Sequence, residues 1–270
     1  MILEFIGVSS GGNEMILTVI GSCANQISNR EGVALVVENN SDNILIDCGP
    51  GIVAAFGRCY RKTSEINNLF ITHVHGDHIS GFPYFVWNRN FECMGKTPPS
   101  DLHVYGERET ISLAHHMLLH CYPELAFPFK VIYHEINAGD FFNCGTIKIE
   151  TVRAIHAVPC LSCIIECDNK KLVYTSDTLY NDALKSKSQN ADMLVHEGMM
   201  PKSMDTLANK VKHSTAFSAG KFANNINAKQ MLLVHIAPGI LGKEKILFDE
   251  AEMNYKGFVS IPYDGSIYKI

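Results

Sequence analysis

The sequence predicts an α/β protein, an αββα sandwich in which two mixed β-sheets pack together and carry helices on their outer faces. Short apolar runs typical of strands outnumber the stretches with helical periodicity. The helical stretches fall at intervals between the strand-like runs. No Pro/Gly/Ser-rich linker or shift in composition divides the 270 residues. We therefore expect one domain over residues 1–270.

The strands are predicted from apolar and β-branched runs that end at turn-forming residues. In chain order they are residues 15–21, 33–37, 43–47, 68–72, 102–105, 131–136, 146–153, 162–167, 171–175, 193–196 and 231–235. The second and third of them read as a hairpin around Asn39-Asn40-Ser41-Asp42. Helices are expected at residues 52–60, 107–120 and 212–225, with Ser214 or Thr215 as the cap of the last.

The first residues contain a short internal similarity. Residues 1–10 and 15–24 share a strand-like run that ends in glycine. Ten residues are too few for a solenoid repeat. Either the two runs are paired strands, or residues 1–14 are an added leader and Met15 is the ancestral start.

Charge and cysteine content narrow the classes of function. The net charge is −5 and the pI is about 6.2, which favours a small substrate over polymeric nucleic acid. The nine cysteines have no framework spacing, so we expect reduced thiols in the cytoplasm. No signal peptide or membrane-spanning run is predicted.

A dense group of potential metal ligands follows the predicted strand at residues 68–72. The segment Thr72-His73-Val74-His75-Gly76-Asp77-His78 holds three histidines and one aspartate within six residues. Alternate residues of an extended chain point the same way, so His73 and His75 can converge on one ion. Gly76 allows the chain to turn, so that Asp77 and His78 can face a second ion. Imidazole and carboxylate groups suit zinc, manganese or iron.

Three further candidates lie at the ends of other predicted strands. They are His156, Asp177 and His235. His156 or His235 alone would more often be an ordinary histidine, but the three together complete a set of seven ligands, enough for two metal ions. We therefore predict a dinuclear metal site at a shared rim of the sheets.

These motifs, in this order, resemble the metallo-β-lactamase superfamily and specifically its ribonuclease Z-like branch. The likeness extends from Ile20-Gly21-Ser22 through the histidine cluster and Tyr174-Thr175-Ser176-Asp177-Thr178 to Leu233-Val234-His235. It implies that one metal is held by His73, His75 and His156 and the other by Asp77, His78 and His235, with Asp177 bridging both. Zinc is the expected metal, and manganese is the alternative. Homodimers, common in this branch, are expected from the resemblance alone.

The resemblance also points to the catalytic residues. Two metals can activate water at neutral pH and stabilise charge on the attacking and leaving oxygens. We predict His213 as the general acid for the leaving group and Glu197 as the carboxylate that orients it. Asp77 is counted with the catalytic residues as well as the ligands. Asp47 is expected to hold a ligand histidine, with the end of the hairpin strand as its alternative role. His196 is left as either a supporting or a core residue.

Two other patterns have a structural explanation. Cys160-Leu161-Ser162-Cys163 has the spacing of a zinc site, but no second pair exists in the sequence. Packing is therefore favoured over metal binding. The aromatic group of Phe82, Tyr84, Phe85 and Trp87 could line the site and stack on a nucleobase, yet a packed core is the preferred interpretation.

The choice of substrate depends on what the sequence lacks relative to ribonuclease Z. Those proteins carry a tRNA-gripping arm between the counterparts of His156 and Asp177, but only 20 residues separate these two here. Asp47-Cys48-Gly49-Pro50-Gly51 and Ile236-Ala237-Pro238-Gly239 also depart from the tRNA-processing pattern. The chain thus resembles the compact, armless anti-Pycsar-like phosphodiesterases, which implies hydrolysis of 3′,5′-cyclic nucleotides to monophosphates. The alternatives are tRNA 3′-end processing, or a sulfatase or lactonase on the same fold.

Overall fold

The first sheet has an antiparallel half and a parallel half. The computed structural model describes residues 14–25 and 30–270. From edge to edge, the first sheet contains β14 (Ile267–Lys269), β1 (Ile16–Gly21), β2 (Ala34–Asn39), β3 (Asp42–Ile46), β4 (Asn68–Phe70), β5 (Leu102–Gly106) and β6 (Val131–Glu135). Pairing is antiparallel from β14 to β3 and parallel from β3 to β6.

The second sheet repeats this plan. Its order is β13 (Phe258–Ser260), β12 (Gln230–Val234), β11 (Met193–Glu197), β10 (Lys170–Tyr174), β9 (Leu161–Cys167), β8 (Ile147–Arg153) and β7 (Phe141–Cys144). The strands from β10 to β13 are parallel, and those from β7 to β10 are antiparallel. The parallel strands β10, β11 and β12 therefore end at the same edge, which brings the loops after them together.

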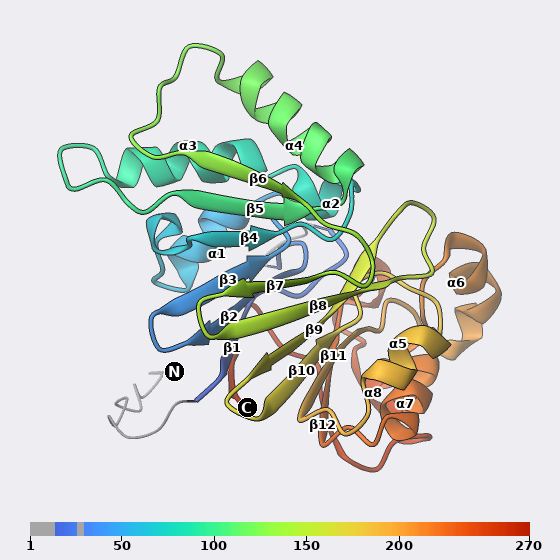
Figure 1. Cartoon of the computed structure of the whole chain (residues 1–270). Helices are drawn as coiled ribbons and strands as arrows, with labels where there is room; N and C mark the ends of the chain where they lie inside the picture. The colour runs from blue at the N-terminus through green and yellow to red at the C-terminus, as the bar shows by residue number, and fades with distance from the viewer. Residues whose placement is uncertain (1–13, 26–29) are drawn as a thin grey trace.

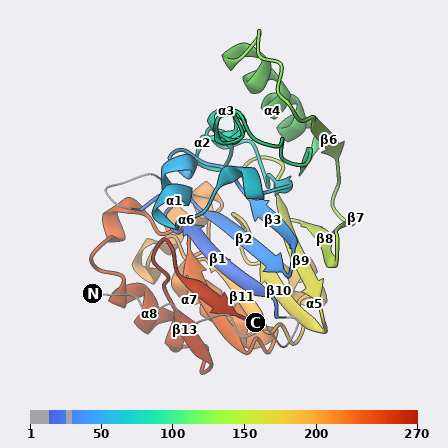
Figure 2. The same cartoon turned by 90° about the vertical axis from the view of Figure 1, so that its left-hand side faces the viewer.

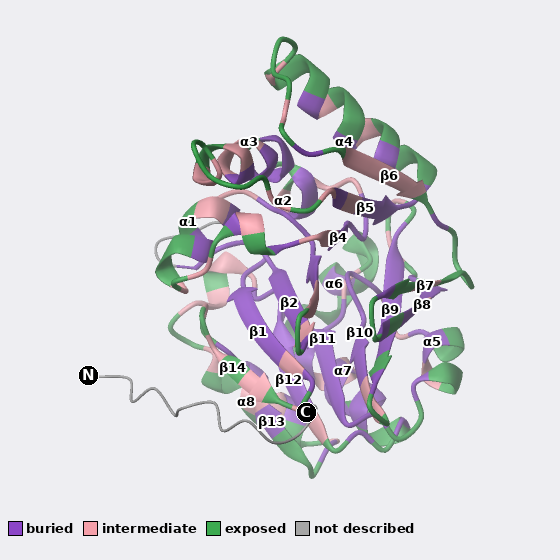
Figure 3. Cartoon of the chain, turned by 60° about the vertical axis from the view of Figure 1, so that its left-hand side comes forward, coloured by how far each residue is buried: buried purple, intermediate pink, exposed green. Residues whose placement is uncertain are grey.

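The two sheets bury their inner faces against each other. Leu17 and Leu35 from the first sheet pack in one cluster with Ile165, Leu172 and Leu232 from the second, and all five are fully buried. The strands at the centre of Figure 3 are accordingly buried along almost their whole length. Burial of this apolar surface provides the main stabilisation of the fold, since each fully buried Leu or Ile contributes about 1.5–3 kcal/mol.

Helices cover the outer face of each sheet. The first sheet is covered by α1 (Ile52–Arg58), α3 (Phe82–Glu92) and α4 (Arg108–Cys121), and the second by α5 (Asp182–Lys187), α7 (Ala216–Asn225) and α8 (Lys245–Glu252). Figures 1 and 2 show the resulting four layers. The predicted αββα sandwich is thus confirmed.

Most predicted elements are present, but several boundaries differ, and the helices α3, α5 and α8 were not predicted. The helix predicted at residues 212–225 begins only at Ala216, because Thr215 is its N-cap and accepts a hydrogen bond from the Ser218 N–H. The edge strand β7 was not predicted, because only two of its residues, Phe142 and Cys144, face the core, which is too few to show the alternation of a strand. Short helices α2 (Gly76–Ile79) and α6 (Asp205–Val211) were also missed, since neither is long enough to show periodicity.

Three other expectations concern the chain as a whole. The leader or paired strand proposed for residues 1–14 lies, apart from Glu14, outside the described residues. All nine cysteines are described and none is in a disulfide, as the sequence predicted. Within residues 14–25 and 30–270, no helix has both the length and the apolar character that crossing a membrane requires.

Candidate metal centre

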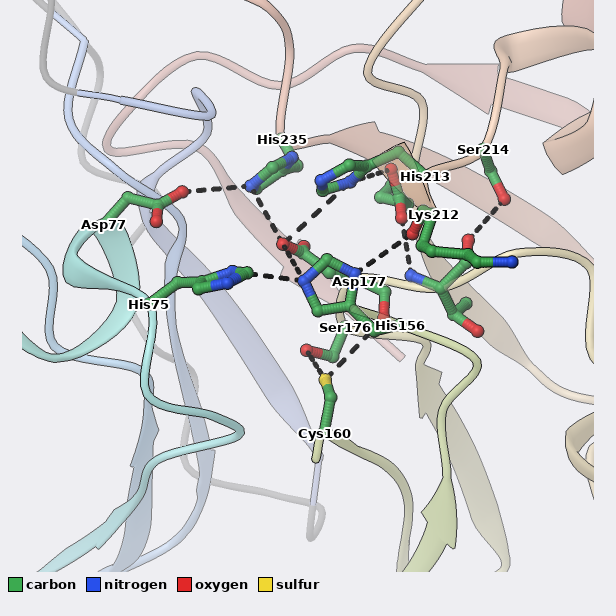
Figure 4. A network of polar contacts seen from close by, with 12 residues as sticks. His75, Asp77, His156, Cys160, Ser176, Asp177, Lys212, His213, Ser214 and His235 are labelled. Carbon is green, nitrogen blue, oxygen red and sulfur yellow. Dashed lines mark hydrogen bonds and ion pairs between the residues drawn. The ribbon is translucent and has the colours of Figure 1, made fainter. Parts of the chain in front are cut away.

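All seven predicted ligands lie at one end of the sandwich, where strands of both sheets finish. His73 follows β4, His156 follows β8, Asp177 follows β10 and His235 directly follows β12. His75 is the extended N-cap of α2, and this one-turn helix carries Asp77 and His78. Figure 4 shows side chains from both sheets converging on Asp177.

The backbone around this point adopts conformations that ordinary residues rarely take. Asp47, Ser176 and His235 all have left-handed φ angles, of 64°, 51° and 58°. Such conformations cost of order 1–3 kcal/mol each and persist only where the surrounding structure enforces them, typically at functional sites. The fold therefore maintains strain at the positions that flank and supply the candidate ligands.

The first group of donors surrounds His75. Its Nδ1 lies 3.1 Å from Nε2 of His73 and 3.1 Å from Nε2 of His156. The Oδ2 atom of Asp177 lies 3.6 Å from the same nitrogen of His73 and 3.9 Å from that of His156. These four donor atoms lie within 4.8 Å of one another.

The second group lies on the other side of Asp177. Nε2 of His235 is 3.4 Å from Nε2 of His78 and 3.3 Å from Oδ2 of Asp77. The Oδ2 atom of Asp177 is 3.3 Å from His78 Nε2 and 3.4 Å from His235 Nε2. Asp177 thus lies between the two groups, and its role as a bridging ligand stays a prediction.

The chemistry of these donors fits divalent cations. Ring nitrogens of five histidines converge with two carboxylates, and these are the donor types that bind divalent cations such as zinc. In addition, the Asp177 Oδ1 atom is buried and has no hydrogen-bond partner among the described residues. A buried unpaired carboxylate oxygen is costly, and coordination of a cation would satisfy it. The assignment of each residue to a particular ion remains a prediction.

Hydrogen bonds orient the candidate ligands from behind. Asp47 is fully buried, and its carboxylate accepts from Nδ1 of His78 at 2.9 Å and from the Thr72 N–H at 2.8 Å. The Thr72 hydroxyl lies 3.0 Å from Nδ1 of His73. His156 donates its Nδ1 proton to the Lys212 carbonyl at 3.0 Å. Each bond leaves the other ring nitrogen free to face the centre, as supporting bonds do in metal sites.

The predicted acid and its partner lie beside the centre. His213 Nδ1 is 3.0 Å from Oε2 of Glu197, and the Thr178 N–H donates to Oε1 of Glu197 at 2.6 Å. Burial of His213 opposes its charged form, but the Glu197 carboxylate outweighs this and raises the pKa of His213 above its usual value. The same His213 nitrogen is 4.0 Å from Asp177 Oδ2. His213 could be a ligand by distance, yet its Nδ1 is already engaged by Glu197.

Comparison with known proteins agrees with this geometry. A family model described as anti-Pycsar protein Apyc1 matches residues 15–253. The chain belongs to this family. It therefore lies in the metallo-β-lactamase superfamily, in the ribonuclease Z-like branch, as predicted, and is a metal-dependent hydrolase.

Individual relatives of this Apyc1-family chain match most of its length at low sequence identity. A ribonuclease Z of Prochlorococcus marinus (strain AS9601) is 24% identical over 300 residues, covering 91% of each chain. The crystal structure of the metallo-β-lactamase fold protein YhfI from Bacillus subtilis superposes with a TM-score of 0.82 at 22% identity and covers 96% of this chain and all of the other. Human tRNase Z, short form, gives a TM-score of 0.78 at 20% identity, covering 94% and 98%.

His196 has a packing role in this family member. It is fully buried, its Nδ1 donates to the Glu197 carbonyl at 2.6 Å, and its ring packs edge-on against Phe222. Burial lowers the pKa of His196 to about 4, so the ring is neutral. Of the two interpretations that the sequence left open, the structure favours a core residue.

Cys160 and Cys163, and part of the aromatic group, have a packing role and do not bind metal. Cys160 and Cys163 are fully buried, and the Cys160 Sγ lies 3.3 Å from the Ser176 hydroxyl. Neither thiol belongs to a potential metal-binding group in the described part of the chain. Phe82 and Phe85 lie in the core under α3. Tyr84, however, is 52% exposed and stacks on Trp87, so core packing explains only half of that aromatic group.

Some supporting residues were not predicted from the sequence. The Lys212 carbonyl holds His156, the Thr178 N–H holds Glu197, and the Ser214 hydroxyl donates to the Thr178 carbonyl at 2.6 Å. The first two act through backbone atoms, which every residue type possesses. Residue identity therefore gives no signal for these roles.

Proposed function

We propose that this chain hydrolyses 3′,5′-cyclic nucleotides to nucleoside monophosphates at a centre that holds two divalent metals. Zinc is the expected metal, because the donors are imidazoles and carboxylates, and manganese is the alternative. Five histidines and two aspartates divide into two donor groups that share Asp177, which supports a dinuclear site.

The short segment between His156 and Asp177 is the observation that favours a small substrate. Between His156 and Asp177 the chain forms only the hairpin of β9 and β10, closed by Asp168 and Asn169, whose φ angles are 48° and 62°. Two successive positive φ angles characterise the tight turns that join adjacent strands. This segment has no extension that could hold a polymer, so a small phosphodiester suits the site better than tRNA.

Each part of the centre then has a task in the reaction. Bound divalent ions would lower the pKa of water towards neutrality and neutralise charge on the phosphoryl oxygens. His213 would donate a proton to the departing ribose oxygen, which as an alkoxide is a poor leaving group. Glu197 keeps the His213 ring in place and stabilises its protonated form. The strained backbone at Asp47 and His235 keeps the second donor group in position.

Processing of tRNA 3′ ends is the second candidate. It is favoured by the name of the Prochlorococcus relative, ribonuclease Z, over 91% of both chains. The short segment between His156 and Asp177 and the net charge of −5 weigh against it. A sulfatase or lactonase is the third candidate, since these reactions require similar metal chemistry.

The test combines metal analysis with a substrate panel. The metal content of protein purified without added metal is measured by elemental mass spectrometry. A dinuclear zinc site predicts two equivalents of zinc per chain. The same sample is then assayed against cAMP, cGMP, cCMP, cUMP, a pre-tRNA with a 3′ trailer, a p-nitrophenyl sulfate and a lactone.

Hydrolysis of a cyclic nucleotide is the expected result. Cleavage of the trailer with all four cyclic nucleotides intact would reverse the preference. Light scattering on the same sample tests the expected homodimer.

A further inference from the structure

One residue beside the centre combines an unusual backbone conformation with a bond to a candidate ligand. Lys212 ends α6 with a φ of 64°, in the left-handed region. Its carbonyl accepts the Nδ1 proton of His156 at 3.0 Å. Figure 4 shows the His156 ring between this carbonyl and His75.

This hydrogen bond determines the tautomer of the His156 ring and the direction in which its Nε2 atom points. A carbonyl can only accept, so Nδ1 must carry the ring proton and Nε2 must keep its lone pair. Nε2 is the atom that lies 3.1 Å from His75 and 3.9 Å from Asp177 Oδ2. The Lys212 carbonyl therefore selects both the tautomer and the direction of His156.

The same conformation also places His213. The left-handed residue ends α6 so that the next N–H, that of His213, bonds back to the Ala208 carbonyl at 2.9 Å. The His213 side chain then faces Glu197, and the Ser214 hydroxyl fixes the following residue to Thr178. The positions of two functional side chains, His156 and His213, thus depend on the backbone conformation of one residue, Lys212.

We propose that Lys212 is a positioning residue that acts through its main chain. Its left-handed conformation aims the carbonyl at His156 and sets His213 opposite Glu197, and its side-chain amine is not required. This inference rests on the roles given to His156 and His213 in the proposed function. The Lys212 side chain is exposed, and within the described residues its amine makes no hydrogen bond or ion pair.

The test compares variants that differ in their tolerance of positive φ. Lys212→Gly and Lys212→Asn remove the amine but accept the left-handed region, whereas Lys212→Val removes it and resists that region. A matched control is available at Tyr60, which also follows a helix with a φ of 55° and is 91% exposed, but lies at the end of α1. Tyr60→Val imposes the same kind of strain away from the centre.

Two measurements report on the metal centre, one on its affinity for zinc and one on its catalytic activity. The affinity of the metal-free protein for zinc is measured by competition with a chelating dye. The kcat and KM of the zinc-loaded protein are measured with bis(p-nitrophenyl) phosphate, an activated diester that reports on the centre even if no cyclic nucleotide is cleaved. Failure of the cyclic-nucleotide proposal is thereby distinguished from failure of this one.

We expect Lys212→Val to weaken the binding of one zinc ion by about 10–100-fold and to lower kcat with little change in KM, as loss of a ligand's supporting bond does. Lys212→Gly and Lys212→Asn should match the wild type, and Tyr60→Val should lower the melting temperature alone. Equal losses in the glycine and valine variants would assign the role to the side chain and overturn the proposal. So would unchanged zinc affinity in Lys212→Val, or a loss of affinity in Tyr60→Val. If Lys212→Val does not fold, the milder Lys212→Ala must fall below Lys212→Gly in zinc affinity.

Discussion

The partly buried His213 pairs with the fully buried Glu197 beside the metal centre, with 3.0 Å between Nδ1 and Oε2. The other oxygen of Glu197 accepts from the Thr178 N–H, and Thr178 directly follows Asp177. The candidate acid is therefore connected to the candidate bridging ligand through one side chain and one peptide bond. Burial lowers the pKa of His213, but the Glu197 carboxylate outweighs this effect and raises it above the usual value, which favours the protonated ring.

This pair predicts an effect that depends on the leaving group. His213→Ala should lower kcat on a cyclic nucleotide by about 10²–10⁴-fold, because the departing alkoxide then lacks a proton donor. The same variant should lose much less on bis(p-nitrophenyl) phosphate, since p-nitrophenolate leaves without protonation. Steady-state assays on both substrates check this, with the exposed His116→Ala as a control. Equal losses on the two substrates would contradict the role as general acid.

Asp47 should control the affinity for metal without being a ligand. Its carboxylate accepts from His78 and Thr72 behind the second donor group. Asp47→Asn keeps the size but removes the charge and one acceptor, so zinc affinity should fall by about 10–100-fold. Competition with a chelating dye measures this. Asp192→Asn, which changes a carboxylate bonded to Lys171 and Lys229 away from the centre, is the matched control and should bind zinc normally.

The sequence predicted the parts of this protein that residue type determines. Buried strands such as β2 and β12 each contain four consecutive apolar residues, so their existence can be recognised locally. The dense run from His73 to His78 is informative because few other roles require such a composition. The other candidate ligands, far apart in sequence, were predicted because each follows a strand, and strands of one sheet end together.

The remaining features depend on contacts that no local pattern records. The edge strand β7 turns only Phe142 and Cys144 towards the core, too few residues for an alternating pattern to be recognised. Lys212 supports His156 through a carbonyl and Thr178 supports Glu197 through an N–H, so neither role constrains the side chain in a recognisable way. His196 could not be assigned either, because a histidine next to Glu197 looks the same whether its ring faces the centre or Phe222.

The core position of His196 predicts a specific dependence of stability on pH. Burial lowers its pKa from 6.5 to about 4 in the folded protein. Between these values the unfolded state binds a proton that the folded state does not, so stability is lost as pH falls from 6.5 towards 4, by about 3 kcal/mol in total. His196→Asn retains a donor for the Glu197 carbonyl but cannot titrate. Urea unfolding should therefore show the wild type more stable at pH 7 and the difference shrinking towards pH 4; a constant difference would contradict the shift.

A pair of glycine substitutions tests whether close backbone packing holds Asp77 in place. A Cβ atom on Gly49 would lie 1.9 Å from the carbonyl oxygen of Asp77, which is backbone and cannot rotate away. Gly49→Ala must therefore displace Asp77, and we expect a loss of about 1–3 kcal/mol in the free energy of unfolding together with weaker zinc binding. Gly57 lies in α1, and a Cβ atom added there would have no neighbouring atom within 4 Å. Gly57→Ala should instead stabilise the protein by about 0.4–1 kcal/mol and leave zinc binding unchanged. Urea unfolding and chelator competition measure both effects, and normal zinc affinity in Gly49→Ala would show that Asp77 does not depend on this contact.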